Sequence, residues 1–527
     1  MRPRLRLAAH ADAVELRLEP PPSPRVGGLR LRTRERSMAI DVGLAPDGRA
    51  SLPIPALLGP EMRRWDVLLV AADGGEAPLC PRPPESQARH FFRTACGGHG
   101  LSAYLSDSAG SLVLFGAPRE RHAQAVQAED ARACFPRWLR ELPLEEDLVL
   151  FESFLGKAYA GNPRYIYEAL RRMRPDLRCV WAYDGAEPIP GDPQRVRRGS
   201  RDYYRLLAQA RYRVNNIRFP VPGRKPQTRY LQTWHGTPLK RLGYDIEVAG
   251  PEADARESFH QESRGWTTLL SPNAFSSRTL RRAFRYRGHV LEAGYPLTDP
   301  LLDPALDRET TVARLGLPAG HRFVLYAPTW RDHRPVGTWR FDFDLQLDLA
   351  AVAAALGPGQ TLLVRAHHLV ASGLDPAGLP ANVRDVSHLD DVSGLCTITD
   401  VLVTDYSSVF FDFAVTGRPI LFHCHDLELY ADRIRGLYLD VEHDLPGPVA
   451  RTTGELVALL DALPQVQSRY AGRYAAFRER FCALNDGRAA QRVVEAVFGP
   501  PPAPIPLAVD PAALGAGPAA TGDPTCA

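Results

Sequence analysis

Between about residue 148 and residue 498, short uninterrupted apolar runs alternate with longer helix-like stretches. The clearest runs are 148–151, 323–326, 362–364 and 401–403. Such runs are typical of strands that are buried on both faces of a parallel sheet, and the stretches between them favour βαβ units. The span holds roughly 350 residues, more than one doubly wound domain usually contains. A break is indicated at 295–309, where three prolines follow a strand. We therefore predict two α/β lobes, 148–300 and 301–498, facing each other across a cleft.

The first 140 residues have a different pattern. Segments such as 14–18 and 29–32 alternate apolar and charged residues, and Gly- and Pro-rich turns separate them. Alternation with a period of two predicts antiparallel strands, and we expect a small β-sandwich-like accessory domain over 1–140. Residues 499–527 are rich in Pro and Ala and have no apolar period, which predicts a disordered tail.

Composition narrows the class of protein. Of the 527 residues 45% are hydrophobic and 24% are charged, so the chain can bury real cores and is not a disordered protein. The net charge of +3 gives no strong field that would indicate nucleic acid as a partner. No apolar run approaches the ~20 residues of a membrane span. The eight cysteines form no CxxC pair, which favours reduced thiols in a cytoplasmic protein that is soluble or binds a membrane only from the side.

Ligands of parallel α/β sheets collect at the carboxyl ends of the strands, so the residues that follow each run are the candidates for a site. The run at 230–231 leads into His235. Gly236 permits a tight turn, Thr237 can cap a helix, and Lys240 is then expected in the first turn of that helix. A histidine beside helix amides and an ammonium group could deprotonate a hydroxyl next to a phosphate. A lone histidine, in contrast, more often packs or caps at a strand end.

Two further runs end in basic residues. Arg331 follows the run at 323–326 and could clamp a phosphate, although a surface arginine is common in so arginine-rich a chain. Arg365 and His367 follow the run at 362–364 and are expected to face a phosphate together. The adjacent pair of His367 and His368 suggests a metal, but no carboxylate lies at ligand spacing, and we predict no metal site.

The fourth run leads into Asp405, Ser407 and Ser408, followed by a helix predicted over 409–416 that ends at Gly417. The serine hydroxyls and the free amides at this helix start are expected to bind a diphosphate. As simple capping serines they would explain the helix start alone.

Together these segments resemble the CDP-glycerol glycerophosphotransferase family of teichoic-acid primases and polymerases. The resemblance covers about 148–498. The motifs that carry it are Phe151-Glu-Ser-Phe-Leu-Gly-Lys157, Asn162-Pro-Arg-Tyr-Ile-Tyr-Glu-Ala-Leu170, Gln232-Thr-Trp-His-Gly-Thr-Pro-Leu-Lys240, Ala327-Pro-Thr-Trp-Arg331, Thr404-Asp-Tyr-Ser-Ser408, Arg435-Gly-Leu-Tyr438 and Asp444-Leu-Pro-Gly-Pro448. Two motifs depart from the family pattern: Arg365-Ala-His-His368 lacks a proline, and Gly294-Tyr-Pro-Leu297 lacks an arginine. The N-terminal 140 residues lie outside the resemblance.

The resemblance implies a GT-B-like pair of Rossmann-type lobes after the sandwich, with the donor bound mainly by the second lobe. It implies His235 as the base on the acceptor hydroxyl, with His367 and Asp405 as further catalytic candidates. The implied donor-diphosphate residues are Arg331, Arg365, Ser407 and Ser408, and the implied acceptor or phosphate residues are Gly236, Thr237 and Lys240.

The same resemblance implies the reactants. A polyol phosphate would pass from CDP-glycerol or CDP-ribitol to a lipid-linked anionic polyol phosphate acceptor, with release of CMP and without a cofactor. The enzyme would then be peripheral at the cytoplasmic face of the membrane.

Three alternatives stay open at this point. A two-lobe sugar transferase would release a nucleoside diphosphate. A non-catalytic protein would only hold a nucleotide, and the combination of His235 with Ser407 and Ser408 speaks against it. A metal-dependent hydrolase would need a ligand set that the sequence does not offer convincingly.

Overall fold

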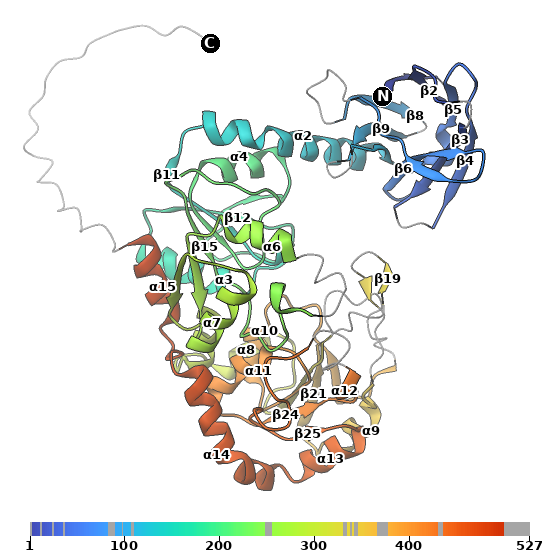
Figure 1. Ribbon diagram of the computed structural model, residues 1–527. Helices are drawn as coiled ribbons and strands as arrows, with labels where there is room; N and C mark the ends of the chain where they lie inside the picture. Colours follow the sequence, from blue (N-terminus) through green and yellow to red (C-terminus); the bar gives the residue numbers. More distant parts are fainter. Residues whose placement is uncertain are drawn as a thin grey trace, which may run out of the picture.

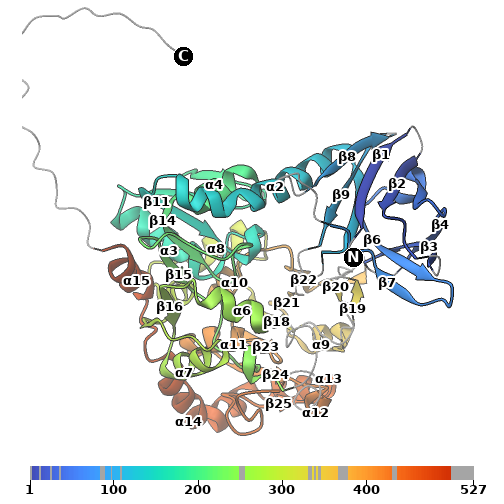
Figure 2. The same ribbon diagram turned by 45° about the horizontal axis from the view of Figure 1, so that its top comes forward.

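The structure is a computed structural model. It describes residues 3–10, 13–23, 26–34, 37–82, 90–96, 98–106, 110–247, 256–329, 346–365, 378–429 and 436–499, and the backbone of 335–337 and 340–341. The chain forms an N-terminal sandwich and two α/β lobes, and the sandwich is set apart from the lobes in both ribbon views (Figures 1 and 2).

The N-terminal part consists of two antiparallel sheets. One has the order β1-β2-β5, and the other has the order β4-β3-β6-β10-β9-β8 with β7 paired to β6. The strands are β1 (Arg4–Ala9), β2 (Ala13–Glu19), β3 (Val26–Thr33), β4 (Ala39–Gly43), β5 (Arg49–Pro53), β6 (Arg63–Ala71), β7 (Glu76–Pro78), β8 (Phe92–Cys96), β9 (His99–Leu105) and β10 (Leu112–Pro118). Leu16 of the first sheet and Leu31 and Trp65 of the second share one buried cluster. The predicted alternation is confirmed, because every second residue of β2 points into this core.

Helix α2 (Arg119–Glu141) connects the sandwich to the first lobe. Near its start, His122 is hydrogen-bonded to Ser102 of β9 at 3.0 Å. Near its end, Phe135 and Trp138 are buried in the core of the first lobe. One helix therefore packs against both parts.

The first lobe is built on a parallel sheet of order β13-β12-β11-β14-β15-β16-β17. Its strands are β11 (Glu145–Glu152), β12 (Arg178–Ala182), β13 (Gln194–Val196), β14 (Ala210–Asn215), β15 (Arg229–Gln232), β16 (Thr268–Ser271) and β17 (His289–Glu292). Its helices include α3 (Gly161–Met173), α4 (Arg201–Gln209), α6 (Arg256–Ser263) and α7 (Ala274–Ala283). Separate buried clusters cover the two faces of the sheet, which confirms the predicted buried parallel strands.

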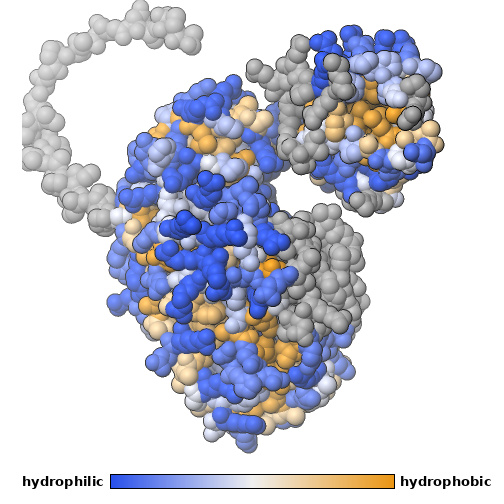
Figure 3. Space-filling view, in the orientation of Figure 1, coloured by the Kyte–Doolittle hydropathy of each residue, from blue (hydrophilic) through white to orange (hydrophobic). Residues whose placement is uncertain are grey.

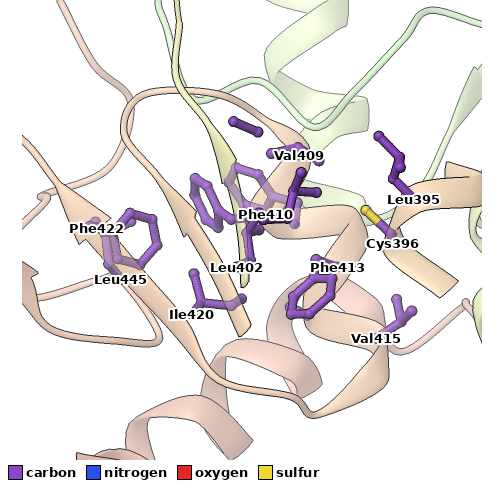
Figure 4. Close-up of a cluster of buried hydrophobic side chains, with 14 of the residues drawn as sticks. Leu395, Cys396, Leu402, Val409, Phe410, Phe413, Val415, Ile420, Phe422 and Leu445 are labelled. Carbon is purple, nitrogen blue, oxygen red and sulfur yellow. The ribbon is translucent and has the colours of Figure 1, made fainter. Parts of the chain in front are cut away.

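The second lobe repeats this design with the order β22-β21-β18-β23-β24-β25. Its strands are β18 (Arg322–Ala327), β21 (Gln360–Val364), β22 (Val383–Asp385), β23 (Val401–Thr404), β24 (Ile420–His423) and β25 (Val449–Ala450), and its helices include α8 (Arg308–Arg314), α9 (Leu349–Ala355), α10 (Val392–Ile398), α11 (Val409–Phe413), α13 (Thr453–Asp461) and α14 (Leu463–Cys482). This is the strand order of a Rossmann sheet, whose direction of winding switches between β18 and β23. Figure 4 shows how Phe410 and Phe413 anchor α11 beside Leu402 and Ile420 of this sheet.

Helix α15 (Ala489–Phe498) returns from the second lobe to the first. It lies within the span that we predicted for the second lobe, but Val493, Val494 and Phe498 are buried in a core of the first. The carboxylate of Asp299 accepts hydrogen bonds from the first amides of this helix, at 3.0 and 2.8 Å. The lobe boundary is thus not a single point in the sequence, since the chain crosses it twice.

Much of the visible surface is hydrophilic, and hydrophobic patches lie on the sandwich and on the second lobe, at the bottom of the view (Figure 3). In the described part of the chain, no helix has both the length and the apolarity that crossing a bilayer requires.

Two acidic residues at the start of α10 hold the lobes together. Asp390 accepts hydrogen bonds from the amide of Tyr159 at 3.1 Å and from the hydroxyl of Tyr183 at 3.2 Å. Asp391 accepts one from the hydroxyl of Tyr165 at 2.5 Å, and Arg164 forms an ion pair with it at 3.4 Å. All four donors belong to the first lobe, so these carboxylates bind across the cleft.

Substitution of Tyr165 by Phe removes one donor of this junction. Because the acceptor is charged, we expect the free energy of unfolding to fall by about 1.5–3 kcal/mol. Amides of α3 and α10 should also exchange faster with solvent. Tyr167→Phe is the matched control, since that hydroxyl donates to Pro190 within one lobe. Faster exchange at α10 in both variants would contradict a specific role of Tyr165 between the lobes. Denaturant titration and hydrogen-exchange mass spectrometry provide the two measurements.

Candidate functional site

A cavity of about 320 Å³ lies between the lobes. The first lobe contributes the loop after β11, with Phe154 and Lys157, and the residue His235 after β15. The second lobe contributes Arg365 after β21 and Asp412 from α11. The cavity also includes the two aspartates that join the lobes. Its size is within the usual range for a small-molecule site, and its wall carries both cationic and acidic groups.

The imidazole of His235 is exposed, and contacts with Asn216 and Trp234 help to orient it. Its Nδ1 lies 2.8 Å from the carbonyl oxygen of Asn216, and the ring of Trp234 stacks on it at a centroid distance of 4.5 Å. A carbonyl can only accept, so Nδ1 bears the proton, and the neutral ring has its lone pair on Nε2. The side chain of Asn216 in turn accepts a hydrogen bond from the amide of Phe154 at 2.8 Å. Asn216 therefore links the orientation of His235 to the cavity wall.

The prediction of a helix after His235 is wrong. Thr237 caps no helix, and Lys240 lies in an extended segment. This segment pairs with the second lobe: Lys240 forms a β-bridge with Leu437, and the amide of Tyr438 donates to the carbonyl of Leu239 at 2.8 Å. Backbone groups that a helix would have satisfied internally are bonded across the lobes instead.

Three residues other than glycine adopt left-handed φ angles at this site. Phe154 and Leu155 have φ of 46° and 61°, and Trp234 has φ of 52°. Each such residue costs of order 1–3 kcal/mol, and the cost persists only where the surroundings fix the conformation. The backbone carbonyl of Trp234 accepts a hydrogen bond from the side chain of Asn162, and the backbone amide of Trp234 donates one to the side chain of Gln232. These bonds hold the strained turn that presents His235.

Gly236 brings the first lobe against the second. A Cβ atom at Gly236 would lie 2.3 Å from Oγ and 2.9 Å from Cβ of Ser408. The turn after β15 therefore contacts the start of α11 directly. Thr237, the next residue, is buried and lies 3.5 Å from the amide group of Asn273.

Asp405 sits where the second sheet switches direction. Its carboxylate accepts hydrogen bonds from the amide and the hydroxyl of Thr329, both at 2.8 Å. These bonds join the ends of β18 and β23, so Asp405 orients the loop after β18.

Ser407 and Ser408 stand at the start of α11, but the side chain of Ser408 does not cap the helix. Ser408 is the N-cap residue, and its side chain makes no capping hydrogen bond. Among the described residues, the side chain of Ser407 accepts one long hydrogen bond, 3.4 Å, from the amide of Val409. The predicted helix 409–416 is present as five α-helical residues and a 3₁₀ turn, and it ends as expected at Gly417, whose φ is 71°.

Arg365 lies in the cavity wall, as the strand-end argument predicted. One of its terminal nitrogens donates to the carbonyls of Leu389 and Asp390, at 2.9 and 3.2 Å. Its buried Nε has no hydrogen-bond partner among the described residues. Burial lowers the pKa of Arg365 from its usual value.

Arg331 and His367, the other basic candidates, lie outside the described residues, as does His368. Within the described ranges, no group of three or more His, Cys, Asp or Glu side chains could hold a metal ion.

Several residues that line the cavity or orient His235 are not among the residues predicted from the sequence. Lys157 stands in a motif of the resemblance, which implies no role for it. Asn216 directly follows a strand, and the pair Asn215-Asn216 after an apolar run was a usable signal. Asp390 and Asp391 directly precede α10 and Asp412 lies within α11, so the strand-end argument does not identify them.

The family model of CDP-glycerol:poly(glycerophosphate) glycerophosphotransferase matches residues 134–499. The chain belongs to this family. The match covers both lobes and leaves out the sandwich, as expected from the motifs.

Relatives with known names support the assignment. The chain is 37% identical over 356 residues to the teichoic acid poly(glycerol phosphate) polymerase of Staphylococcus epidermidis, covering 66% of this chain and 49% of that protein. It is 36% identical over 372 residues to the teichoic acid glycerol-phosphate transferase of Staphylococcus aureus, covering 68% of this chain and 95% of that protein. The chain thus spans about half the length of the first curated relatives it matches.

Solved structures agree with the fold. The wall teichoic acid polymerase TagF superposes with a TM-score of 0.66 at 35% identity, over 72% of this chain and 96% of that one. A histidine-to-asparagine variant of TagF, solved after a soak with the compound abbreviated CDPG, gives the same TM-score of 0.66 at 34% identity, over 72% of this chain and 96% of that one.

Substitution of Gly236 by Ala tests the contact between the two motifs. The added methyl group would overlap Ser408, so we expect a loss of about 1–3 kcal/mol in the free energy of unfolding. Ser408→Gly in the same chain should restore most of this loss. Gly472→Ala is the control, because that exposed position in α14 has open space around it and should gain about 0.5–1 kcal/mol. A Gly236→Ala protein as stable as the parent would contradict the close approach of the lobes.

Proposed function

We propose that this protein transfers glycerol phosphate, or a related polyol phosphate, from a CDP-activated donor to a polymeric or lipid-linked acceptor, with release of CMP. The observation that carries the proposal is the oriented His235 in a cavity between two Rossmann-type lobes, next to the serines of α11. Membership of the glycerophosphotransferase family supports the reaction class. The relatives named as glycerol-phosphate polymerase and transferase support glycerol as the polyol.

Each part of the site has a role in this proposal. Nε2 of His235 takes the proton of the acceptor hydroxyl, since Nδ1 is bonded to the carbonyl of Asn216. Ser407 and Ser408 bind the donor diphosphate together with Arg331 and His367. Arg365 and Lys157 add positive charge at the cavity, where it offsets the negative charge of the phosphates.

The chemistry is an in-line displacement. The deprotonated acceptor oxygen forms a bond to the β-phosphorus of the donor, and the bond from that phosphorus to the bridging oxygen breaks. CMP leaves with that oxygen, and His235 retains the proton until solvent removes it. Such transfers depend mainly on positioning and charge stabilisation. The left-handed turn at Trp234 and the bonds of Asn162 supply this positioning.

A lipid-linked acceptor would require the enzyme to work at the cytoplasmic surface of a membrane. CDP-ribitol is the alternative donor.

Substitution of His235 by Ala should reduce the rate of CMP release by about 10²–10⁴-fold, because a general base contributes this much. The assay uses CDP-glycerol or CDP-ribitol with a short polyol phosphate acceptor, and it follows both CMP and the length of the acceptor. Donor affinity, measured by calorimetry, should stay within about threefold, because the base acts on the acceptor.

His260→Ala is the matched control, since that histidine lies on α6, is hydrogen-bonded to the carbonyl of Phe284 and does not line the cavity. Turnover that is unchanged in His235→Ala would refute the role of His235. Release of a nucleoside diphosphate from a nucleotide sugar, with no CMP from either CDP donor, would instead identify a sugar transferase.

Substitution of Ser408 by Ala removes a hydroxyl that makes no capping bond. If this hydroxyl binds the charged diphosphate, kcat/KM for the donor should fall by about 10–100-fold, and the thermal stability should not change. Ser276→Ala, which removes a buried hydroxyl without a partner among the described residues, is the control. A changed melting temperature with unchanged kinetics would mean that Ser408 is structural.

A further inference from the structure

Three aspartates line the cavity between the lobes, and they differ in what they bind. Asp390 and Asp391 accept hydrogen bonds from the first lobe and so belong to the junction. No hydrogen bond from a described residue reaches Asp412. Asp412 is thus the one aspartate of the described wall whose carboxyl group is not used by the fold.

The carboxyl group of Asp412 is half-buried in an apolar environment. Its neighbours in α11, Val409, Phe410, Phe411 and Phe413, are buried. The ionisable groups that interact electrostatically with Asp412 are Tyr295, Cys396 and Cys482. They are neutral at pH 7 and supply no opposite charge. A polar group that is partly withdrawn from water and has no partner lowers stability, and such a group in a native site indicates a function.

We propose that Asp412 binds a hydroxyl group of the polyol at the reactive end of the acceptor, next to the hydroxyl that His235 deprotonates. This inference rests on the proposed transfer reaction. Asp412 is then a positioning and specificity residue for the acceptor, in addition to the residues that the motifs identified.

The chemistry of the cavity favours a hydroxyl as the ligand. Lys157 and Arg365 of this cavity attract phosphate, whereas a carboxyl group carries no positive charge for a phosphate and can hydrogen-bond a hydroxyl. Burial raises the pKa of Asp412 to about 8, and the carboxyl group can accept a hydrogen bond from a hydroxyl in either protonation state.

The place of the cavity favours the acceptor over the donor. His235, the proposed base on the acceptor, lines the cavity with Asp412, and neither Ser407 nor Ser408 does. A chain that ends in glycerol phosphate presents a primary hydroxyl and, on the next carbon, a secondary one. Attack by the first beside His235 leaves the second for Asp412.

The test compares two acceptors that differ in one hydroxyl. One ends in glycerol phosphate, and the other ends in 1,3-propanediol phosphate, which lacks the secondary hydroxyl. We expect the wild type to prefer the glycerol end by about 10–100-fold in kcat/KM, as expected for a site with a buried polar group. Asp412→Ala should lose about that factor with the glycerol end and nothing with the propanediol end. Asp412→Asn, which still forms hydrogen bonds, should lie between them.

The outcomes separate the two proposals. Suppose that the wild type releases CMP and that Asp412→Ala loses kcat/KM equally with both acceptors, or with neither. Either result would overturn the role of Asp412 and leave the transfer reaction standing. No CMP from the wild type with either acceptor would overturn both.

Stability provides the control for folding. Because Asp412 has no partner among the described residues, Asp412→Ala and Asp412→Asn should melt at or above the temperature of the wild type. Asp461→Ala, at the exposed end of α13, should change neither stability nor acceptor preference. If Asp412→Ala melts lower, the near-isosteric Asp412→Asn carries the kinetic comparison, and a lower melting temperature for both would indicate a structural role and refute the proposal.

Discussion

The site depends on the hydrogen bonds that join the two lobes. Asp390 and Asp391 at one place, and the pairing of Lys240 with Leu437 at another, fix one lobe relative to the other. Neither lobe alone has the cavity, because His235 comes from the first and Asp412 from the second. Hydrogen bonds from tyrosine, arginine and amide donors to charged carboxylates are strong where the groups are partly buried. The junction can therefore keep the cavity in one shape.

Several features near the proposed reaction centre lower the stability of the fold. Phe154 and Trp234 adopt left-handed φ angles, and the half-buried Asp412 receives no hydrogen bond from any described residue. Nearby, a hydrogen bond donated by the side chain of Asn162 to Trp234 and one accepted by the side chain of Asn216 from Phe154 compensate for this loss. This distribution fits a site in which rigid groups are oriented before a ligand arrives, so that less ordering is needed during the reaction.

The sequence predicted the sheets well because buried parallel strands leave uninterrupted apolar runs. It also predicted that His235, Arg365 and Asp405 follow strand ends, and each does. It failed at Thr237 and Lys240, where a capping residue, a proline and polar residues imitate a helix start. Local propensity was outweighed there, because backbone groups of this segment pair with the opposite lobe.

The sequence by itself determined the fold class, the family and the residues at the strand ends, because these follow from local apolar patterns and contiguous motifs. Only the tertiary structure decided that Gly236 meets Ser408 across the lobes, that α15 completes the core of the first lobe, and that Asp412 faces the cavity of His235. These contacts join residues far apart in the chain, and one sequence holds no periodicity that relates such residues. Their geometry is set by the packing of whole lobes.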